Sequence, residues 1–388
     1  MKMKGNRFIL AITLAITAFT AGCWDYKEID DQIIVSGAAI DYDRESKGVL
    51  LTAEIALPTS SGKESAFSSK IYQGKGQNII DAAVNLRSKA GRRLLWSHSK
   101  VLILSEEFTK KARLLIGAMD WMKRSHETRD TVWLLLSEEA TAAEIFRKSN
   151  PQTQKIISHY LDYLFLSRSA ETFFSVPFSK FMDDLQSASA AAVLPTVRLE
   201  NSITGTLPFV NGTAVLNQAR LAGRLDGKQT RILLLLTNNL KQAVFTPESA
   251  SKEKVQAVSL ILTQSQASIE PVLLPNGLTM RIRVKMEAEI GEIDGRQNVF
   301  TPDNLKKVTA GYQRLIEGQI NQTLALLKQN YQSDVIGFGN KVEDNYPKLW
   351  KKLKSNWRNE YAKIPSDTRV KLTISGSALS MKETKVGH

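Results

Sequence analysis

The chain has a single cysteine, Cys23, among its 388 residues, and this limits how its fold can be stabilised. No disulfide bond can form within the chain, and no cysteine-based metal site is available. Small domains often rely on disulfides, but a chain of this length can bury enough apolar surface to fold without them. The sequence therefore predicts two or three globular domains that are held together by hydrophobic cores.

Cys23 directly follows a segment with the organisation of a secretory signal peptide. Three basic residues precede an uncharged, mostly apolar run over residues 8–21, which is shorter than the roughly 20 residues that a membrane-spanning helix needs. The run ends in Thr20-Ala21-Gly22-Cys23, which resembles the bacterial lipobox with threonine in place of the usual leucine. We predict that residues 1–22 are a lipoprotein signal peptide and that Cys23 carries a diacylglyceryl group. Its two acyl chains, such as palmitate, would anchor the mature chain at the outer face of the cytoplasmic membrane. The alternative is that Cys23 is an ordinary free thiol.

Charge divides the rest of the chain into two unlike halves. Residues 23–200 carry 23 basic and 23 acidic residues, whereas residues 201–388 carry 26 basic and 16 acidic residues. Pro195 and Pro208 flank an irregular segment near the same point. We predict an N-terminal region over residues 23–200, which can comprise two subdomains, a C-terminal domain over 201–378 and a tail over 379–388.

The N-terminal region has the pattern of a mixed α/β fold. Short apolar segments of strand length alternate there with segments whose apolar residues have helical spacing. Residues 58–70 are mostly small and polar and are predicted to form an exposed loop. No apolar run after the signal peptide is long enough to span a membrane.

The C-terminal domain is predicted to be α+β, with a sheet packed on a long helix. Apolar residues alternate with polar ones over residues 278–290, which indicates an antiparallel or edge strand with one buried face. Thr301-Pro302-Asp303 has the N-cap, proline and acid of a helix start, and the helix is expected to reach about Tyr331. We also expect a strand over 231–237 and a helix over 341–358.

The sequence shows no motif of an enzyme, a cofactor site or a metal site. Its four histidines do not occur in pairs at metal-ligand spacing: His98, His126, His159 and His388. His126-Glu127 begins like a zincin motif, but Asp130 stands where the second histidine is needed. Gly74-Lys75-Gly76 lacks the Lys-Ser/Thr of a phosphate-binding loop. We predict no catalytic residue, no cofactor and no metal, and also no nucleic-acid partner, because secretion separates the protein from nucleic acid.

One basic amphipathic segment is a candidate for contact with a membrane or a partner. Leu349 and Leu353 fall with two tryptophans on one face of a helix, and lysines surround this face. The candidate contact residues are Lys348, Trp350, Lys351, Lys352, Lys354 and Trp357. A basic helix with tryptophan can lie on an anionic bilayer. The alternative is that the apolar face packs on the domain's own core and that the lysines meet solvent.

Several short motifs occur in order over nearly the whole mature chain. They are Gly22-Cys23-Trp24-Asp25, Gly37-Ala38-Ala39-Ile40-Asp41, Leu94-Leu95-Trp96-Ser97-His98-Ser99-Lys100, Asn211-Gly212-Thr213, Leu221-Ala222-Gly223-Arg224-Leu225, Asp334-Val335-Ile336-Gly337-Phe338-Gly339, Trp350 and Trp357. As an ordered set they resemble the Ger(x)C family of spore germination lipoproteins, the C subunits of nutrient germinant receptors. The departures are Thr20 and Leu216, where a bulkier aromatic residue is expected.

The resemblance implies a non-enzymatic subunit in the inner membrane of the spore. Its partners would be the A- and B-type integral membrane subunits of a receptor that senses small nutrients. The resemblance gives only Cys23 a chemical role, and it transfers no ligand-contact residue. His98 lies in one of the matching motifs, and we expect it to have a structural hydrogen-bonding role and not a chemical one. Two other classes remain open: a solute-binding lipoprotein of a transporter, and a lipid-anchored cell-wall hydrolase.

Overall fold

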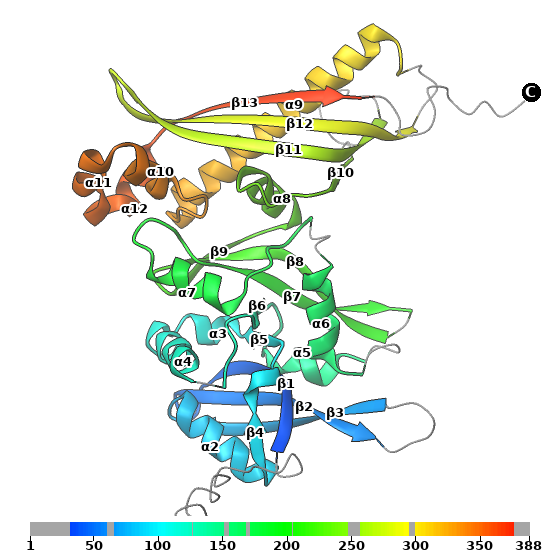
Figure 1. Ribbon diagram of the computed structural model, residues 1–388, viewed down its shortest axis with the longest axis vertical. Helices are drawn as coiled ribbons and strands as arrows, with labels where there is room; N and C mark the ends of the chain where they lie inside the picture. Colours follow the sequence, from blue (N-terminus) through cyan, green and yellow to red (C-terminus); the bar gives the residue numbers. More distant parts are fainter. Residues whose placement is uncertain are drawn as a thin grey trace, which may run out of the picture.

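The computed structural model describes residues 32–59, 66–125, 127–150, 155–167, 171–203, 205–246, 257–294 and 299–375. These residues form an elongated molecule in which two sheets follow one another along the long axis (Figure 1). The predicted signal peptide, Cys23, His126 and the predicted tail with His388 lie outside the described residues. Within the described residues, no helix is both long enough and apolar enough to cross a bilayer.

The first sheet contains nine strands. They are β1 (Gln32–Asp43), β2 (Gly48–Thr59), β3 (Ala66–Gly76), β4 (Arg93–Leu95), β5 (Val101–Leu104), β6 (Trp133–Ser137), β7 (Val193–Ser202), β8 (Gly205–Asn217) and β9 (Arg220–Leu225). Their order is β3-β2-β1-β5-β6-β7-β8-β9, and β4 pairs with β1. The central pairs from β1 to β7 are parallel, whereas β2, β3, β8 and β9 are paired antiparallel. The predicted mixed α/β character is thus confirmed.

Helices cover both faces of this sheet. Residues of α2 (Ile79–Ala90), α4 (Ala112–Arg124) and α7 (Phe178–Gln186) join one core, together with the short α3 (Glu106–Thr109). Residues of α5 (Ala143–Lys148) and α6 (Ile157–Leu166) join a second core on the other face. Strand β5 is buried at every position, because a central parallel strand is covered from both sides.

The second sheet has four strands in the order β10-β11-β12-β13. Its strands are β10 (Ala243–Phe245), β11 (Ala257–Leu274), β12 (Gly277–Asp294) and β13 (Ser366–Ile374). The alternation predicted for 278–290 is present, with every second residue from Met280 to Ile290 buried. Strand β12 is antiparallel to β11 but parallel to β13, so it lies inside the sheet and not at its edge.

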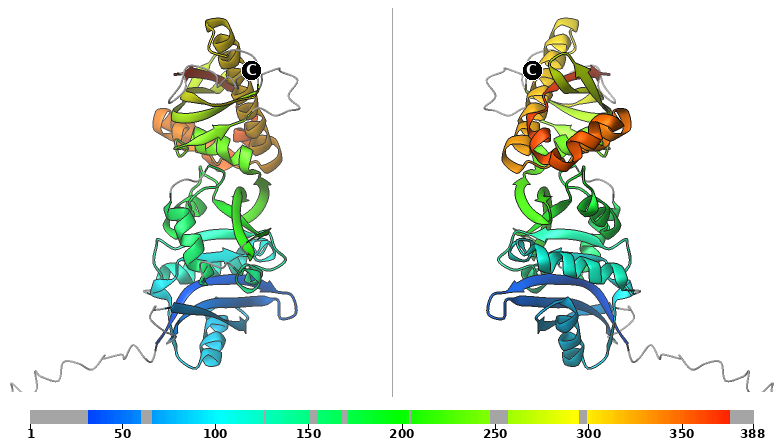
Figure 2. Two further views of the ribbon diagram at one scale, coloured as in Figure 1. Left: turned by 90° about the vertical axis from the view of Figure 1, so that its right-hand side faces the viewer. Right: turned by 90° about the vertical axis from the view of Figure 1, so that its left-hand side faces the viewer.

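A long helix packs on the second sheet, as predicted (Figure 2). Helix α9 (Pro302–Ala325) continues as the π-helical segment η3 (Leu326–Tyr331). The Thr301 side chain accepts a hydrogen bond from Asn304 N, and Pro302 occupies the first turn, as expected for a helix start. The buried stripe of α9 includes Val308, Tyr312, Ile316, Ile320 and Leu324.

The predicted strand over 231–237 is wrong, because these residues belong to helix α8 (Gly227–Leu236). Asp226 and Gln229 form a capping box, in which each side chain accepts a hydrogen bond from the backbone N–H of the other residue. The run from Ile232 to Leu236 is buried throughout, because α8 contributes to the cores of both sheets. A helix that is covered on several sides shows no amphipathic period.

Two further expectations need correction. The predicted helix over 341–358 is interrupted and forms α10 (Phe338–Asn345), α11 (Pro347–Leu353), the 3-10 turn η4 (Lys354–Asn356) and α12 (Trp357–Lys363). Pro347 cannot continue a helix from α10, since it lacks an N–H group and restricts the residue before it. The predicted loop over 58–70 is too long, since strand β3 begins at Ala66 and pairs with β2.

The first sheet extends past the predicted domain boundary. Residue 200 lies inside β7, and strands β8 and β9 add to the same sheet as far as Leu225. The division of the chain into domains over 23–200 and 201–378 therefore remains a prediction. In the structure, the first sheet ends at Leu225, and the second sheet begins after it.

Candidate functional site

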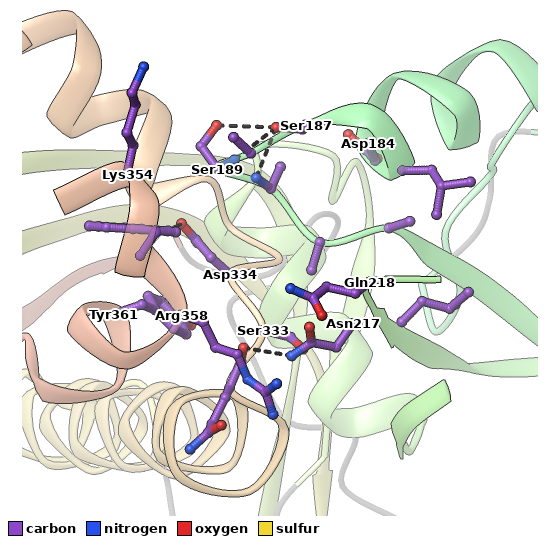
Figure 3. A pocket seen from close by; sticks show the side chains of 18 of the residues that line it. Asp184, Ser187, Ser189, Asn217, Gln218, Ser333, Asp334, Lys354, Arg358 and Tyr361 are labelled. Carbon is purple, nitrogen blue, oxygen red and sulfur yellow. Dashed lines mark hydrogen bonds between the residues drawn. The ribbon is translucent and has the colours of Figure 1, made fainter. Parts of the chain in front are cut away.

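The two sheets meet at a junction that contains a cavity of about 490 Å³ (Figure 3). From the N-terminal side it is lined by the segment after α7 and by the turn between β8 and β9. From the C-terminal side it is lined by the segment after η3, by η4 and by α12. Its polar side chains include Ser187, Asn217, Gln218, Ser333, Asn356 and Asn359. Hydroxyl and carboxamide groups donate and accept hydrogen bonds, so these walls suit a small polar molecule.

Asp334 borders this cavity and holds the start of helix α10. Its Oδ1 accepts hydrogen bonds from Gly337 N and Phe338 N, both at 2.9 Å. Its Oδ2 accepts from Gly339 N at 2.8 Å and from Trp357 Nε1 at 3.1 Å. The carboxylate thus satisfies the free N–H groups at a helix N-terminus, which also attracts negative charge.

The glycines of the same motif are required by geometry. Gly337 has a φ of 81°, in the left-handed region that glycine enters at low cost. A Cβ atom on Gly339 would lie 2.7 Å from Ser189 Cβ and 3.0 Å from atoms of Trp350 and Trp357. The motif Asp334–Gly339 is therefore a structural unit that packs α10 against the N-terminal part and the two tryptophans.

Two buried charges give the junction unusual electrostatics. Burial raises the pKa of Asp334 to about 6, although its four N–H donors act in the opposite direction. Burial also lowers the pKa of Lys328 on η3 to about 8. Lys328 Nζ donates to Ile364 O and Ser366 Oγ, each at 2.7 Å, and thereby ties η3 to the start of β13.

Direct contacts fasten the two sheets to each other beside the cavity. Tyr331 lies against Gly223 of β9, where an added Cβ would be 2.1 Å from the ring, and the Tyr331 hydroxyl donates to Arg224 O at 2.6 Å. Asn217 Nδ2 donates to Tyr331 O at 3.2 Å and to Gln332 O at 3.0 Å. The motif around Gly223 therefore provides a docking surface for η3.

Two buried carboxylates in the first sheet act on helices as Asp334 does. Asp41 on β1 accepts from Ala142 N at 2.6 Å and from Ala143 N at 3.1 Å, at the start of α5. Burial raises the pKa of Asp41. Glu54 on β2 accepts from Ile157 N and Ser158 N, both at 2.8 Å, at the start of α6. These carboxylates fix α5 and α6 to the sheet.

The structure separates the residues of the predicted basic contact. Trp350 and Trp357 are only 4% and 5% exposed and belong to the core of the second sheet. Their rings contact each other, with centroids 5.1 Å apart. Lys348, Lys351, Lys352 and Lys354 are exposed. The tryptophans thus pack inside the domain, and only the lysines remain as surface candidates.

The remaining predicted residues are dispersed. His98 is exposed at the end of the 3-10 turn η2 (Trp96–His98) in the first sheet, far along the chain from the junction. Over the described ranges, no three His, Cys, Asp or Glu side chains are grouped so that they could hold a metal ion. The junction cavity was missed by sequence reasoning. The available signal is the Ala/Ser-rich sequence of residues 187–192, which line the cavity.

Comparison with known families gives matches to both parts of the chain. The model described as "Spore germination protein N-terminal domain" matches residues 25–199. The model described as "Spore germination B3/ GerAC like, C-terminal" matches residues 211–378. The division between the two models lies near residue 200, although the first sheet continues to Leu225.

Curated relatives are similar over nearly their full length. Spore germination protein KC of Bacillus subtilis (strain 168) is 24% identical, with 96% of this chain and 97% of that protein covered. Spore germination protein GerQC of Bacillus cereus is also 24% identical, with 96% and 99% covered. Spore germination protein B3 of Bacillus subtilis (strain 168) is 22% identical, with 91% and 92% covered.

A solved structure shares the fold. The crystal structure of the GerBC protein superposes with a TM-score of 0.58 at 16% identity, and the match covers 87% of this chain and 97% of that chain. This likeness confirms the multi-domain α+β fold. With both family models matched in order, the chain belongs to the family of GerAC-like spore germination proteins.

Proposed function

We propose that this protein is a lipid-anchored, non-enzymatic subunit of a membrane receptor that detects nutrients and starts spore germination. The observation that carries the proposal is the ordered match of two spore germination models to residues 25–199 and 211–378. Relatives named as spore germination proteins align over more than nine tenths of their own length. Their names support a role in germination for the whole chain and not for one part of it.

The proposed partners are the A- and B-type integral membrane subunits of the receptor, in the inner membrane of the spore. Lipid on Cys23 would confine this subunit to the plane of that membrane. Such confinement raises its effective concentration near membrane-embedded partners without any new contact. The buried carboxylates of Asp41, Glu54 and Asp334 each accept hydrogen bonds from N–H groups at a helix start, which supports a structural and not a catalytic use of these groups.

The exposed lysines of α11 and η4 are proposed to contact an acidic face of a partner subunit. Replacing Lys351, Lys352 and Lys354 with glutamine should weaken association with the assembled receptor. The loss should be smaller at high salt, because the screening length between exposed charges falls from about 8 Å at physiological ionic strength to about 3 Å at 1 M salt. Glutamine at Lys306 and Lys307 of α9, which are also exposed, is a matched control. If both variants bind the receptor at low salt as strongly as the wild type does, the lysines of α11 and η4 contact only solvent.

Deletion of the gene tests the proposed function directly. The deletion should abolish germination in response to one class of nutrient, while sporulation and germination by non-nutrient agents remain intact. Cys23→Ala should cause a partial loss, because the protein would lose its confinement to the membrane but keep its contact surfaces. If spores that lack this gene and its paralogues still respond to every nutrient, the receptor assignment is wrong.

The junction cavity favours a second candidate, a solute-binding lipoprotein. A cavity of about 490 Å³ with both polar and apolar walls, between two packed parts, is a common location for a small-molecule site. A tight ligand would raise the melting temperature of the purified protein in proportion to the logarithm of its concentration. Melting curves with amino acids, sugars and nucleosides test this candidate, and a flat response to all of them would exclude tight binding by this subunit alone.

A further inference from the structure

Helix α2 exposes an apolar ridge at one end of the elongated molecule. Its inner side packs on the sheet through Ile79, Ala82 and Leu86. On the opposite side, Ile80 and Val84 lie one helical turn apart and are 54% and 57% exposed. Isolated exposed apolar residues are ordinary on a protein surface. The position and the surroundings of this pair therefore determine whether it forms a contact site.

The chain enters the structure at the same end. Strand β4 follows α2 after two residues, and Arg93 of β4 pairs with Gln32, the first described residue of β1. Figures 1 and 2 show α2 at the end of the long axis, with the second sheet at the opposite end. Eight residues separate Cys23 from Gln32, and a fully extended chain of this length spans at most about 30 Å.

A lipid on Cys23 would therefore keep the α2 end close to the membrane surface. The basic helix α11 lies in the other half of the molecule (Figure 1). An upright molecule that is held by so short a tether brings α2 to the bilayer and holds α11 away from it. Helices α2 and α11 thus face different surroundings.

Charge at this end complements an anionic bilayer. Arg87, Lys89 and Arg92 are exposed at the C-terminal end of α2 and just beyond it. Asp81 follows Ile80 in the first turn of the helix, and its Oδ2 accepts a hydrogen bond from Gln77 N at 2.9 Å. The eight tether residues carry four acidic residues and one basic residue, so the tether itself supplies no attraction to anionic lipid. An exposed apolar ridge beside basic residues is the arrangement of helices that lie in a membrane interface.

We propose that the outer face of α2 rests on the anionic surface of the membrane that holds Cys23, with Ile80 and Val84 inserted among the headgroups and Arg87, Lys89 and Arg92 on lipid phosphates. This inference rests on the proposed lipid anchor. It orients the subunit, because the second sheet and the junction cavity then point away from the bilayer.

Site-specific quenching tests the orientation without requiring native lipidation. The mature chain with Cys23→Ser is attached by an N-terminal histidine tag to vesicles that contain a nickel-chelating lipid, phosphatidylglycerol and a doxyl-labelled lipid. A fluorophore is placed at Val84→Cys, or at Val244→Cys on β10, which is similarly exposed at 43% in the other half of the molecule. We expect quenching at residue 84 and not at residue 244, and a smaller effect when phosphatidylglycerol is replaced with phosphatidylcholine.

Charge variants give the second arm, with the untagged Cys23→Ser chain and phosphatidylglycerol vesicles. Each basic residue near an anionic surface strengthens binding by roughly fivefold, so replacing Arg87, Lys89 and Arg92 with glutamine should weaken binding by about 100-fold. The matched triple variant at Lys351, Lys352 and Lys354 should bind as wild type does.

Three results would overturn the proposal. The first is equal quenching of the fluorophores at residues 84 and 244 when the protein is attached to the vesicles. The second is loss of vesicle binding in the α11 variant instead of the α2 variant. The third is a change in the fluorescence of the label at residue 84 that occurs only when partner subunits are added. The last result would assign the ridge to a protein partner. Mass spectrometry of the native N-terminus reports separately on the lipid anchor, so failure of the anchor and failure of the α2 contact are distinguishable.

Discussion

Gly223 on β9 and Tyr331 at the end of η3 form a contact between the two sheets whose strength can be measured by a double-mutant cycle. A Cβ atom on Gly223 would lie 2.1 Å from a ring carbon of Tyr331. Gly223 does not have a positive φ, so a strand residue such as valine fits its backbone. The three atoms nearest to an added Cβ all belong to the Tyr331 ring, so the ring is the main source of the steric cost. Gly223→Val should lower the free energy of unfolding by about 1–3 kcal/mol, as overpacking does.

Tyr331→Ala removes the obstacle and also removes native contacts. The variant loses the packing of a partly buried ring and the hydroxyl hydrogen bond to Arg224 O at 2.6 Å, so it should cost about 2–4 kcal/mol. In this background the valine at position 223 has room. The double variant should then be about as stable as Tyr331→Ala alone, which gives a coupling energy of about 1–3 kcal/mol between the two positions.

Urea denaturation of the four proteins, followed by circular dichroism and tryptophan fluorescence, measures the cycle. Gly318→Ala on α9 is a control, because an added Cβ there meets nothing within 4 Å, and it should raise stability by up to about 1 kcal/mol. If the effects of Gly223→Val and Tyr331→Ala add within about 0.5 kcal/mol, the ring does not occupy the space beside Gly223 and the described junction is wrong.

Three further predictions concern buried charges. Burial holds the pKa of Lys328 at about 8 in the folded state, against 10.5 in the unfolded chain, so the wild type should gain up to about 3 kcal/mol of stability as pH rises from 8 to 10.5. Lys328→Met should lack this gain in denaturation curves at pH 7.5 and 10.5, roughly the two ends of that window, and an equal gain in both proteins would contradict the assignment. Asp334→Ala leaves four N–H donors without their acceptor and should cost about 2–5 kcal/mol, with faster hydrogen exchange at α10; unchanged exchange there would argue against the carboxylate as its anchor. Glu54→Gln should release the start of α6 at a cost of about 2–4 kcal/mol, and protease cleavage near residue 157 should increase, whereas cleavage near α5 should not change.

Local signals predicted the parts of the fold that depend on neighbouring residues. The period-two alternation of 278–290 identified β12 and its buried face, because a strand places successive side chains on opposite faces. The N-cap Thr301 and Pro302 identified the start of α9, because those residues act on N–H groups in the next turn. The position of β12 inside its sheet was not predicted, since β13, its parallel neighbour, is distant in the chain: Met280 pairs with Ser366.

Long-range packing decided the rest. The run Ile232–Leu236 suits a buried strand as well as a buried helix, and only the capping box at Asp226 and burial between two cores make it α8. The tryptophans of the basic segment fit a membrane face or a core equally well by periodicity. In the structure both tryptophans belong to the core of the second sheet and pack against Gly339 of α10. Gly339 lies outside residues 348–357, so the periodicity of that segment could not show this contact.

The sequence by itself determined the single cysteine, the charge difference between the two halves, the ordered motifs and the main strand and helix of the C-terminal part. The tertiary structure decided the uses of the motif carboxylates, since Asp41 meets the start of α5 across 101 residues of chain. It also decided the junction cavity and the exposed ridge on α2. The physical reason is that helix periodicity shows which residues share a face, whereas the neighbouring elements determine whether that face meets a core, a cavity or solvent.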